Sequence, residues 1–445
     1  MENDSIPVMP ERRFSIVGIP NWFAFGSVII YVLFPLINMF RRMRDDSEFL
    51  FNPWRDYIFW IAGLFVLLLF IAVLEYPCKE KLIAAWQNFW HHPTYIILAA
   101  LAVWMFVSTA VTGFVYGSVI GSEKSRTGLI CSLVYLVFFI MGIRVKKTRP
   151  GVWIGVFLAT AGALNLLILI DYFFGLKLDL AGSGPVFYNS NHLAYYLLTE
   201  TVTAEAAFLL SPSRVRRVAA LCVYCTGIGA LILSDTLGCS VALVLTFVFA
   251  AIILPLTRKF HPIRFAAALV AAVAVFLCLY FVPNTSGVTQ KQVIEKNFSV
   301  LQESAEAATD IGSASDSLGS GRMALWRSAV NATLEKPIFG QGLAEMRVRL
   351  IVDTHGGNDT AHNEFLEYAS NHGVPALLLY VAFILAVYIR GARHRRSLTD
   401  VEVLSLIVAF AYLVSSVFGV TMFYTAPYLF LFLGLGYCCT EKKTA

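Results

Sequence analysis

The chain has 445 residues, of which 58% are hydrophobic and only 14% charged, and its mean hydropathy is +0.69. Because a soluble domain usually carries about 25% charged residues, this composition excludes a soluble globular enzyme and a disordered chain. The net charge of +5 comes mostly from short loops and gives no reason to expect a nucleic-acid partner. The apolar runs are long and lack the alternation of a transmembrane barrel, so we predict an all-α polytopic membrane protein.

Apolar stretches recur along the whole chain, and a helix needs about 20 such residues to cross a bilayer. The polar start, with Glu2, Asp4 and Glu11, argues against a cleavable signal peptide. We expect one membrane domain over 1–445, and a length of about 20 apolar residues for each crossing gives about twelve spans. The predicted spans are 20–40, 57–75, 95–115, 128–143, 152–174, 192–210, 218–234, 239–256, 264–282, 373–390, 402–420 and 424–440.

Basic residues in short loops set the expected orientation. The clusters at 144–149, 213–217, 258–264 and 390–396 fall in every second loop, so these loops are predicted to be cytoplasmic. The alternation also puts the basic stretch 41–44 outside, against its usual preference. It places one long loop, 283–372, on the outer face between predicted spans nine and ten.

The long loop is the first place to look for chemistry, because long loops in compact proteins are usually functional or disordered. It carries seven Lys/Arg against eleven Asp/Glu, so its arginines do not reflect a basic bias. Residues 321–330 have the pattern of an amphipathic helix, and 337–342 predict a turn with two glycines. Arg347 and Arg349 follow this turn.

His362 is the candidate base, since it stands at the expected membrane surface just before a helix start. The helix N-terminus and any nearby arginine would lower its pKa and keep it neutral. The alternative is an interfacial residue that only caps or anchors the helix. A metal site is not expected, because no cysteine or third histidine completes a set with His355 and His362.

Short motifs occur in a set order from the long loop into the next span. They are Gly321-Arg322, Leu325-Trp326, Pro337-Ile338-Phe339-Gly340-Gln341-Gly342, Ala361-His362-Asn363 and Gly373. This order resembles the O-antigen ligase/polymerase superfamily, in which a His-Asn pair closes a large periplasmic loop and a glycine follows. One departure is Ala376, where the family usually has Gly, Thr or Tyr.

Residues 184–192, Gly-Pro-Val-Phe-Tyr-Asn-Ser-Asn-His, resemble the stretch that opens another span in this family. A third motif is poorer, because 235–238 lack the arginine of the family's Ser-Arg-Gly. The missing arginine leaves one expected phosphate contact unfilled. Lys124 and Arg126, in a predicted outer loop, are candidates to replace it.

The resemblance implies a GT-C-like fold in the bacterial inner membrane, with the active site facing the periplasm. It also implies transfer of a glycan from undecaprenyl pyrophosphate to an acceptor hydroxyl, which needs a base and cations for the leaving pyrophosphate. His362 and Arg322 are the implied catalytic residues, and arginines make a metal or other cofactor dispensable. The implied substrate-binding residues are Arg347, Arg349, Asn363, Asn191, His192 and Trp326.

Several alternatives stay open at this point. Arg322 could form a structural ion pair with Glu335 or Glu345, and Asn191 could be a helix cap. Arg347 and Arg349 point in different directions on a strand or a helix, so at most one is expected to reach a phosphate.

An O-antigen ligase with lipid A-core as acceptor is the leading function. The second candidate function is a polymerase that joins lipid-linked units, and the third is a protein O-oligosaccharyltransferase. A transporter or flippase would require intramembrane charges, for which Asp171 is the main acidic candidate.

Overall fold

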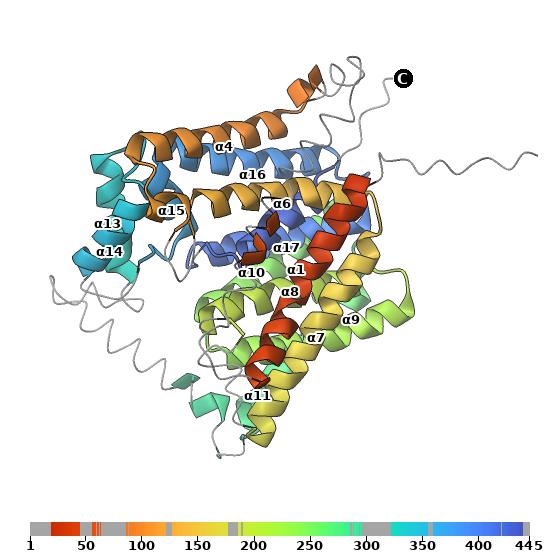
Figure 1. Cartoon of the computed structure of the whole chain (residues 1–445). Coiled ribbons are helices and arrows are strands. Elements are labelled where there is room, and N and C mark those ends of the chain that lie inside the picture. The colour runs from red at the N-terminus through yellow and green to blue at the C-terminus, as the bar shows by residue number, and fades with distance from the viewer. Residues whose placement is uncertain are drawn as a thin grey trace, which may run out of the picture.

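The fold is entirely helical in the part of the chain that the computed structural model describes. That part comprises residues 19–44, 89–121, 127–176, 186–187, 190–284, 322–354, 359–419 and 421–438, with some residues of 56–63, 86–87 and 287–295. In Figure 1 some long helices run side by side across the view while others cross them obliquely, and a group of short helices sits at one end. The all-α prediction is confirmed.

Eight helices of the described part are long and apolar enough to cross a membrane. They are α1 (Ile19–Arg44), α4 (Pro93–Thr112), α6 (Leu129–Lys146), α7 (Pro150–Phe174), α9 (Arg214–Leu233), α10 (Leu237–Leu256), α11 (Pro262–Phe281) and α16 (Val374–Arg393). The protein is therefore a polytopic membrane protein, as its hydropathy predicts.

Three further predicted spans correspond to helices that are shorter or more polar. They are α8 (Ser190–Leu210), α17 (Asp400–Ser416) and α18 (Ala426–Gly436). The eleven residues of α18 are fewer than the predicted 424–440, because turn structure precedes the helix and extended backbone follows it. Most of the predicted span 57–75 lies outside the described residues, so the count of twelve stays a prediction.

Two carboxyl groups of α8, those of Glu200 and Glu205, are completely buried. The Nδ2 of Asn165 on α7 donates a hydrogen bond to Oε1 of Glu200 at 2.8 Å. Asp171, the acidic residue that the sequence favoured, is only partly buried near the end of α7. The helix α8 thus carries two buried acids, and interhelical hydrogen bonding offsets part of the desolvation of Glu200.

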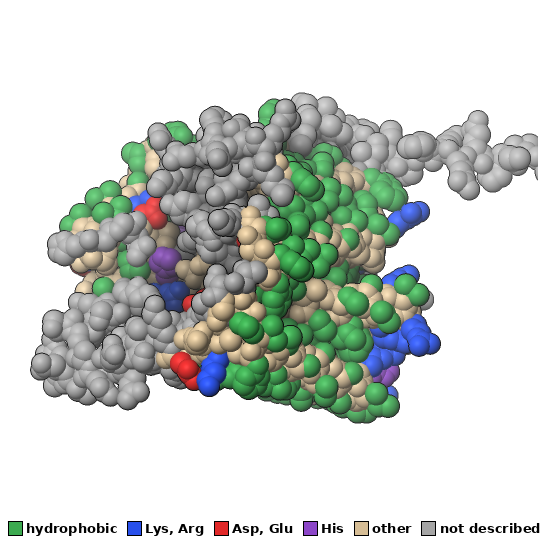
Figure 2. All heavy atoms as spheres, turned by 90° about the horizontal axis from the view of Figure 1, so that it is seen from below, with side chains coloured by type: hydrophobic (Ala, Val, Ile, Leu, Met, Phe, Trp, Pro, Cys, Tyr) green, Lys and Arg blue, Asp and Glu red, His purple; other side chains and the backbone are tan. Residues whose placement is uncertain are grey.

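The predicted cytoplasmic loops meet at one end of the bundle. Lys146 pairs with Glu402 at 2.9 Å, and Lys259 pairs with Asp400. The guanidinium of Arg149 lies 5.9 Å from the ring of Trp22, so α1 begins at this end of the bundle. The basic C-terminus of α1 therefore lies at the opposite end, as the alternation of inner and outer loops predicts. Figure 2 shows Lys and Arg side chains gathered at that end, with hydrophobic side chains covering the flank.

Short helices occupy the opposite end of the bundle. These are α13 (Arg322–Glu335), α14 (Leu343–Thr354) and α15 (Glu364–His372), with the four-residue α5 (Tyr116–Val119) beside them. They share a small core made of Leu325, Ala329, Ala332, Met346, Leu350 and Ala361. The amphipathic helix predicted at 321–330 is confirmed as the first part of α13.

The turn at 337–342 fastens these helices to the bundle. The Gln341 N–H donates to the carbonyl of Ser370 and the Val374 N–H to that of Pro337, both at 2.8 Å. The ring of Phe339 stacks on Trp104 of α4, with centroids 5.4 Å apart. The motif turn and the α15–α16 junction therefore form one unit.

Gly373 makes this junction possible, and Gly373→Ala is expected to destabilise the protein by about 2 kcal/mol or more. Its φ is +86°, and a Cβ there would lie 1.9 Å from the carbonyl oxygen of Ile338. Thermal unfolding of the purified protein measures the effect. Gly155→Ala on α7 is the matched control, because nothing lies within 4 Å of its Cβ position. Equal melting temperatures for the two variants would contradict this explanation.

Candidate active site

His362 occupies the turn that leads into α15, at a φ of +51°. A non-glycine residue in this region is uncommon, and such conformations cluster at functional sites. Its Nδ1 atom is buried and has no hydrogen-bond partner among the described residues. Burial lowers the pKa of His362 to about 4, and the charge of Arg322 acts in the same direction. The imidazole is therefore neutral at pH 7, as predicted, although burial contributes more than the arginine.

The next residue fixes the turn. Asn363 is the N-cap of α15, and its Oδ1 accepts a hydrogen bond from the Leu366 N–H at 3.1 Å. An N-cap of this kind contributes about 1 kcal/mol. The predicted substrate-binding role of Asn363 thus rests on its amide NH₂ group, since the oxygen is occupied by the cap.

Arg322 is the first residue of α13 and is partly buried. Among the described residues, no carboxylate and no hydrogen-bond acceptor pairs with it. The ion pairs considered from the sequence do not form, because Glu335 binds Arg349 and Glu345 binds Lys336. The charge of Arg322 instead acts on the groups around it, which are His362, Tyr195 of α8 and Cys239 of α10.

Trp326 lies one turn further along α13. Its ring centroid is 6.1 Å from that of Phe418, which follows α17. The indole Nε1 is buried and has no partner in the described part of the chain. An N–H group in this position is available as a donor to a bound substrate.

The start of α8 lies beside the same group of residues. His192 is buried there, interacts electrostatically with His362, and has its ring 5.7 Å from that of Tyr424. Asn191 is already inside the helix, and its Oδ1 accepts a hydrogen bond from the Thr236 hydroxyl at 3.3 Å. This contact joins two of the sequence motifs, since Thr236 stands in the segment that lacks the family's arginine.

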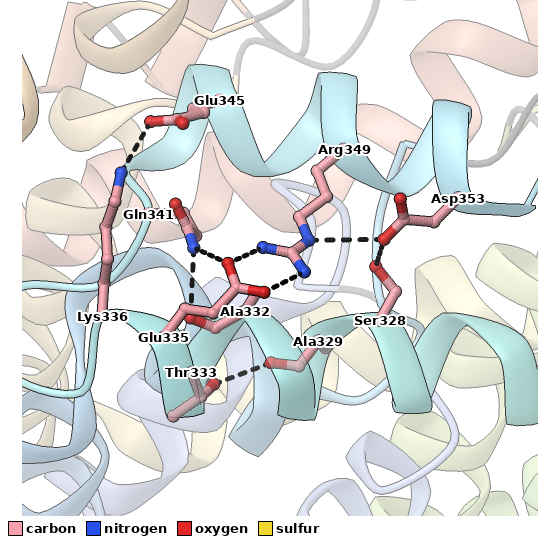
Figure 3. A network of polar contacts seen from close by, with 10 residues as sticks. All are labelled: Ser328, Ala329, Ala332, Thr333, Glu335, Lys336, Gln341, Glu345, Arg349 and Asp353. Atoms are coloured by element: carbon pink, nitrogen blue, oxygen red, sulfur yellow. Dashed lines mark hydrogen bonds and ion pairs between the residues drawn. The ribbon is translucent and has the colours of Figure 1, made fainter.

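Arg347 and Arg349 are in different surroundings. The Nη2 of Arg347 donates to Oγ1 of Thr127 at 2.7 Å, and its Nε lies 3.8 Å from Asp359. Arg349 grips Glu335 with both terminal nitrogens, one of them at 2.8 Å, and reaches Asp353 at 3.3 Å (Figure 3). Arg349 thus joins α13 to α14, in keeping with the expectation that at most one of the two reaches a phosphate.

Arg349→Ala is expected to lower thermal stability slightly, because a partly exposed ion pair contributes little to the free energy of unfolding. The rate of glycan transfer should stay within about tenfold of wild type, because Arg349 is engaged by Glu335 and Asp353. Transfer assays and melting curves on the same preparation test this. A loss of transfer as large as that of Arg322→Ala would show instead that Arg349 holds the substrate.

Two acids of α15, the buried Glu364 and the partly buried Glu367, were missed by the sequence reasoning. Glu364 accepts hydrogen bonds from the hydroxyls of Tyr380 at 2.7 Å and Tyr412 at 3.0 Å. Burial raises the pKa of Glu364 to about 7 and that of Glu367 to about 8. Their spacing of three residues directly after the His-Asn pair is a helical signal that could have identified them.

The pH dependence of the reaction should show the lowered pKa of His362. A base must be unprotonated, so transfer by the free enzyme should hold from pH 7.5 to 5.5 and fall only as the pH approaches about 4. An unperturbed histidine would lose about tenfold over that same interval. The acid limb of kcat/KM for the acceptor distinguishes the two cases.

These groups lie together at the end of the bundle opposite the basic loops. Figure 2 shows histidine, Lys/Arg and acidic side chains in a hollow there. The predicted residues Lys124, Arg126 and His355 lie outside the described residues. A neutral imidazole and an arginine without a carboxylate partner among the described residues, carried by a polytopic helical bundle, are the groups that a membrane enzyme would need to transfer a group from an anionic carrier.

Residues 220–381 match the family model described as O-Antigen ligase. This part of the chain, which contains Arg322 and His362, is an O-antigen ligase domain, and the resemblance found in the sequence is confirmed. The match indicates a lipid-linked glycan transferase. No curated protein matches the chain.

Proposed function

We propose that the protein transfers a glycan from undecaprenyl pyrophosphate to the hydroxyl of lipid A-core, as an O-antigen ligase. The observation that carries this proposal is the pair formed by His362, neutral and with an unpaired Nδ1, and Arg322, which has no carboxylate partner in the described structure. The first supplies a base and the second a cation, and the reaction needs both.

In the proposed reaction, His362 removes the proton of the acceptor hydroxyl as its oxygen attacks the anomeric carbon of the donor. The bond between that carbon and the pyrophosphate oxygen breaks, and its electron pair leaves with undecaprenyl pyrophosphate. Arg322 binds the phosphate oxygens as their negative charge increases. His362 afterwards releases its proton to solvent, so no metal or other cofactor takes part.

In the proposal this chemistry takes place at the periplasmic face of a bacterial inner membrane. The scaffold is GT-C-like and has about twelve membrane-spanning helices, as the lengths of the apolar stretches predict. The separation of charge supports that placement. The basic loops gather at one end of the bundle and the candidate site lies at the other (Figure 2), which is the arrangement expected when basic loops are cytoplasmic.

The acceptor distinguishes a ligase from its two relatives in mechanism, the polymerase and the protein O-oligosaccharyltransferase. The test incubates purified protein in lipid nanodiscs with a fluorescent glycan on undecaprenyl pyrophosphate and with one acceptor at a time. We expect label on lipid A-core. Label on a second lipid-linked unit or on protein would identify one of the alternatives, and no transfer to any acceptor would refute the proposal.

A further inference from the structure

A second polar site lies beside the candidate base. It is a pocket between α14, α15 and the start of α6, lined on its polar side by Thr127, Arg347, Asp359, Glu367, Ser370 and Asn371. Neither Arg322 nor His362 lines it, but Thr360 and Ala361, which directly precede His362, do. The charge of Asp359 acts on both His362 and Arg347, so the pocket adjoins the base.

The pocket contains buried polar atoms without partners. Ser370 is completely buried, and its Oγ, like Oε1 of Glu367, makes no hydrogen bond within the described part of the chain. A buried polar atom left unpaired costs about 1–3 kcal/mol. A ligand that both donates and accepts hydrogen bonds would remove this cost, and sugar hydroxyls do both.

The charges of the pocket do not suit pyrophosphate. Arg347 is the one Lys or Arg among the described residues that line it, and it lies 3.8 Å from Asp359 and is held by Thr127. Burial raises the pKa of Glu367 to about 8, so this acid is mostly protonated and a hydrogen-bond donor at pH 7. The net charge of the described lining residues is therefore close to zero, whereas Arg322 is a cation with no carboxylate partner in the described part of the chain.

We propose that this pocket binds the terminal sugar of the acceptor, a neutral ring rich in hydroxyls, and that Arg347 and Glu367 are acceptor-binding residues. The identification of the ring as the acceptor's rests on the proposed function. His362 then lies between two substrates, with the donor phosphates at Arg322 and the acceptor ring at Arg347. The hydroxyl of a ring seated next to residues 359–361 has only a short distance to reach the base.

Direct binding tests the pocket without any turnover. The probe is a phosphate-free core oligosaccharide released from lipid A, and saturation-transfer NMR measures its binding to the full chain in nanodiscs. We expect Arg347→Met to weaken binding at least about tenfold, as the loss of a charged hydrogen-bond donor implies. Lys336→Met removes an equal charge from the same loop outside the pocket and should bind like wild type, as should Arg322→Met.

A second variant controls for the case in which Arg347→Met loses binding because it misfolds. Thr127→Val is nearly isosteric and removes only the hydroxyl that orients Arg347, so it should fold and still bind several-fold more weakly. Wild-type binding by both Thr127→Val and Arg347→Met would overturn the proposal. Displacement of the oligosaccharide by inorganic pyrophosphate, together with loss of binding in Arg322→Met, would also overturn it and assign the pocket to the donor.

The two proposals can fail separately. If the wild type binds the oligosaccharide as described but transfers no glycan in the nanodisc assay, the proposed reaction fails and the sugar pocket stands. If transfer to lipid A-core occurs but the pocket variants keep wild-type affinity and an unchanged KM for that acceptor, the pocket assignment fails alone.

Discussion

Replacement of His362 by alanine is expected to slow glycan transfer by about 10²- to 10⁴-fold, the usual contribution of a general base. The imidazole combines a pKa well below 7 with a ring nitrogen that has no partner among the described residues. Transfer is measured with purified protein at saturating donor and acceptor. His394→Ala, at the basic end of the bundle, is the matched control and should keep wild-type activity.

A purely structural role for His362 predicts different behaviour. If the ring only holds the turn before α15, exogenous imidazole cannot restore activity to His362→Ala. If the ring is the base, small imidazoles should restore part of the rate, and the restored rate should follow the pKa of the added compound. Undiminished transfer by His362→Ala would remove the residue from the mechanism.

Substitution of Arg322 by lysine is expected to be almost as damaging as substitution by alanine, with losses of about 10²- to 10³-fold in kcat, the cost of removing one donor from a charge-stabilising site. A guanidinium binds two phosphate oxygens at once through a planar fork, which an ammonium cannot do. Arg327→Lys, on the exposed face of the same helix, controls for effects on α13. Full activity of Arg322→Lys would show that any positive charge suffices.

The sequence alone could not tell which arginine is available to a phosphate. Arg322, Arg347 and Arg349 all lie in the same acidic loop, and only the packing of α13 against α14 brings Glu335 to Arg349. The same packing leaves Arg322 without a carboxylate partner among the described residues. Ion pairs between two helices depend on how the helices are aligned against each other. The pattern of residues within one helix does not determine that alignment.

Local signals succeeded where the chemistry is local. The α13 helix followed from its amphipathic pattern. The lowered pKa of His362 was predicted from a helix start and a nearby arginine, but its main cause is burial, which is a tertiary effect. The glycines of the motifs were recognised as a pattern, but their reason is tertiary: Gly373 accommodates the carbonyl of Ile338, and Gly340 lies against the backbone of Asn371.

The buried acids show a limit of span prediction from hydropathy. Predicted span 192–210 contains Glu200 and Glu205, and its helix α8 is not among the eight that are apolar enough to cross a membrane. The carboxyl of Glu200 is enclosed by Asn165 and by the close approach of α9 at Gly227, whose Cβ position is 2.7 Å from Oε1 of Glu200. Only the packed structure shows that these charges are internal.

Product analysis by mass spectrometry tests the central claim most directly. Purified wild-type protein and His362→Ala are incubated with undecaprenyl-pyrophosphate glycan and lipid A-core, and all products are quantified. The proposed mechanism predicts one undecaprenyl pyrophosphate released for each glycosylated lipid A-core in the wild type, and neither product above background in the variant. Equal yields from the two proteins, or glycan that stays on its lipid carrier in both, would contradict it.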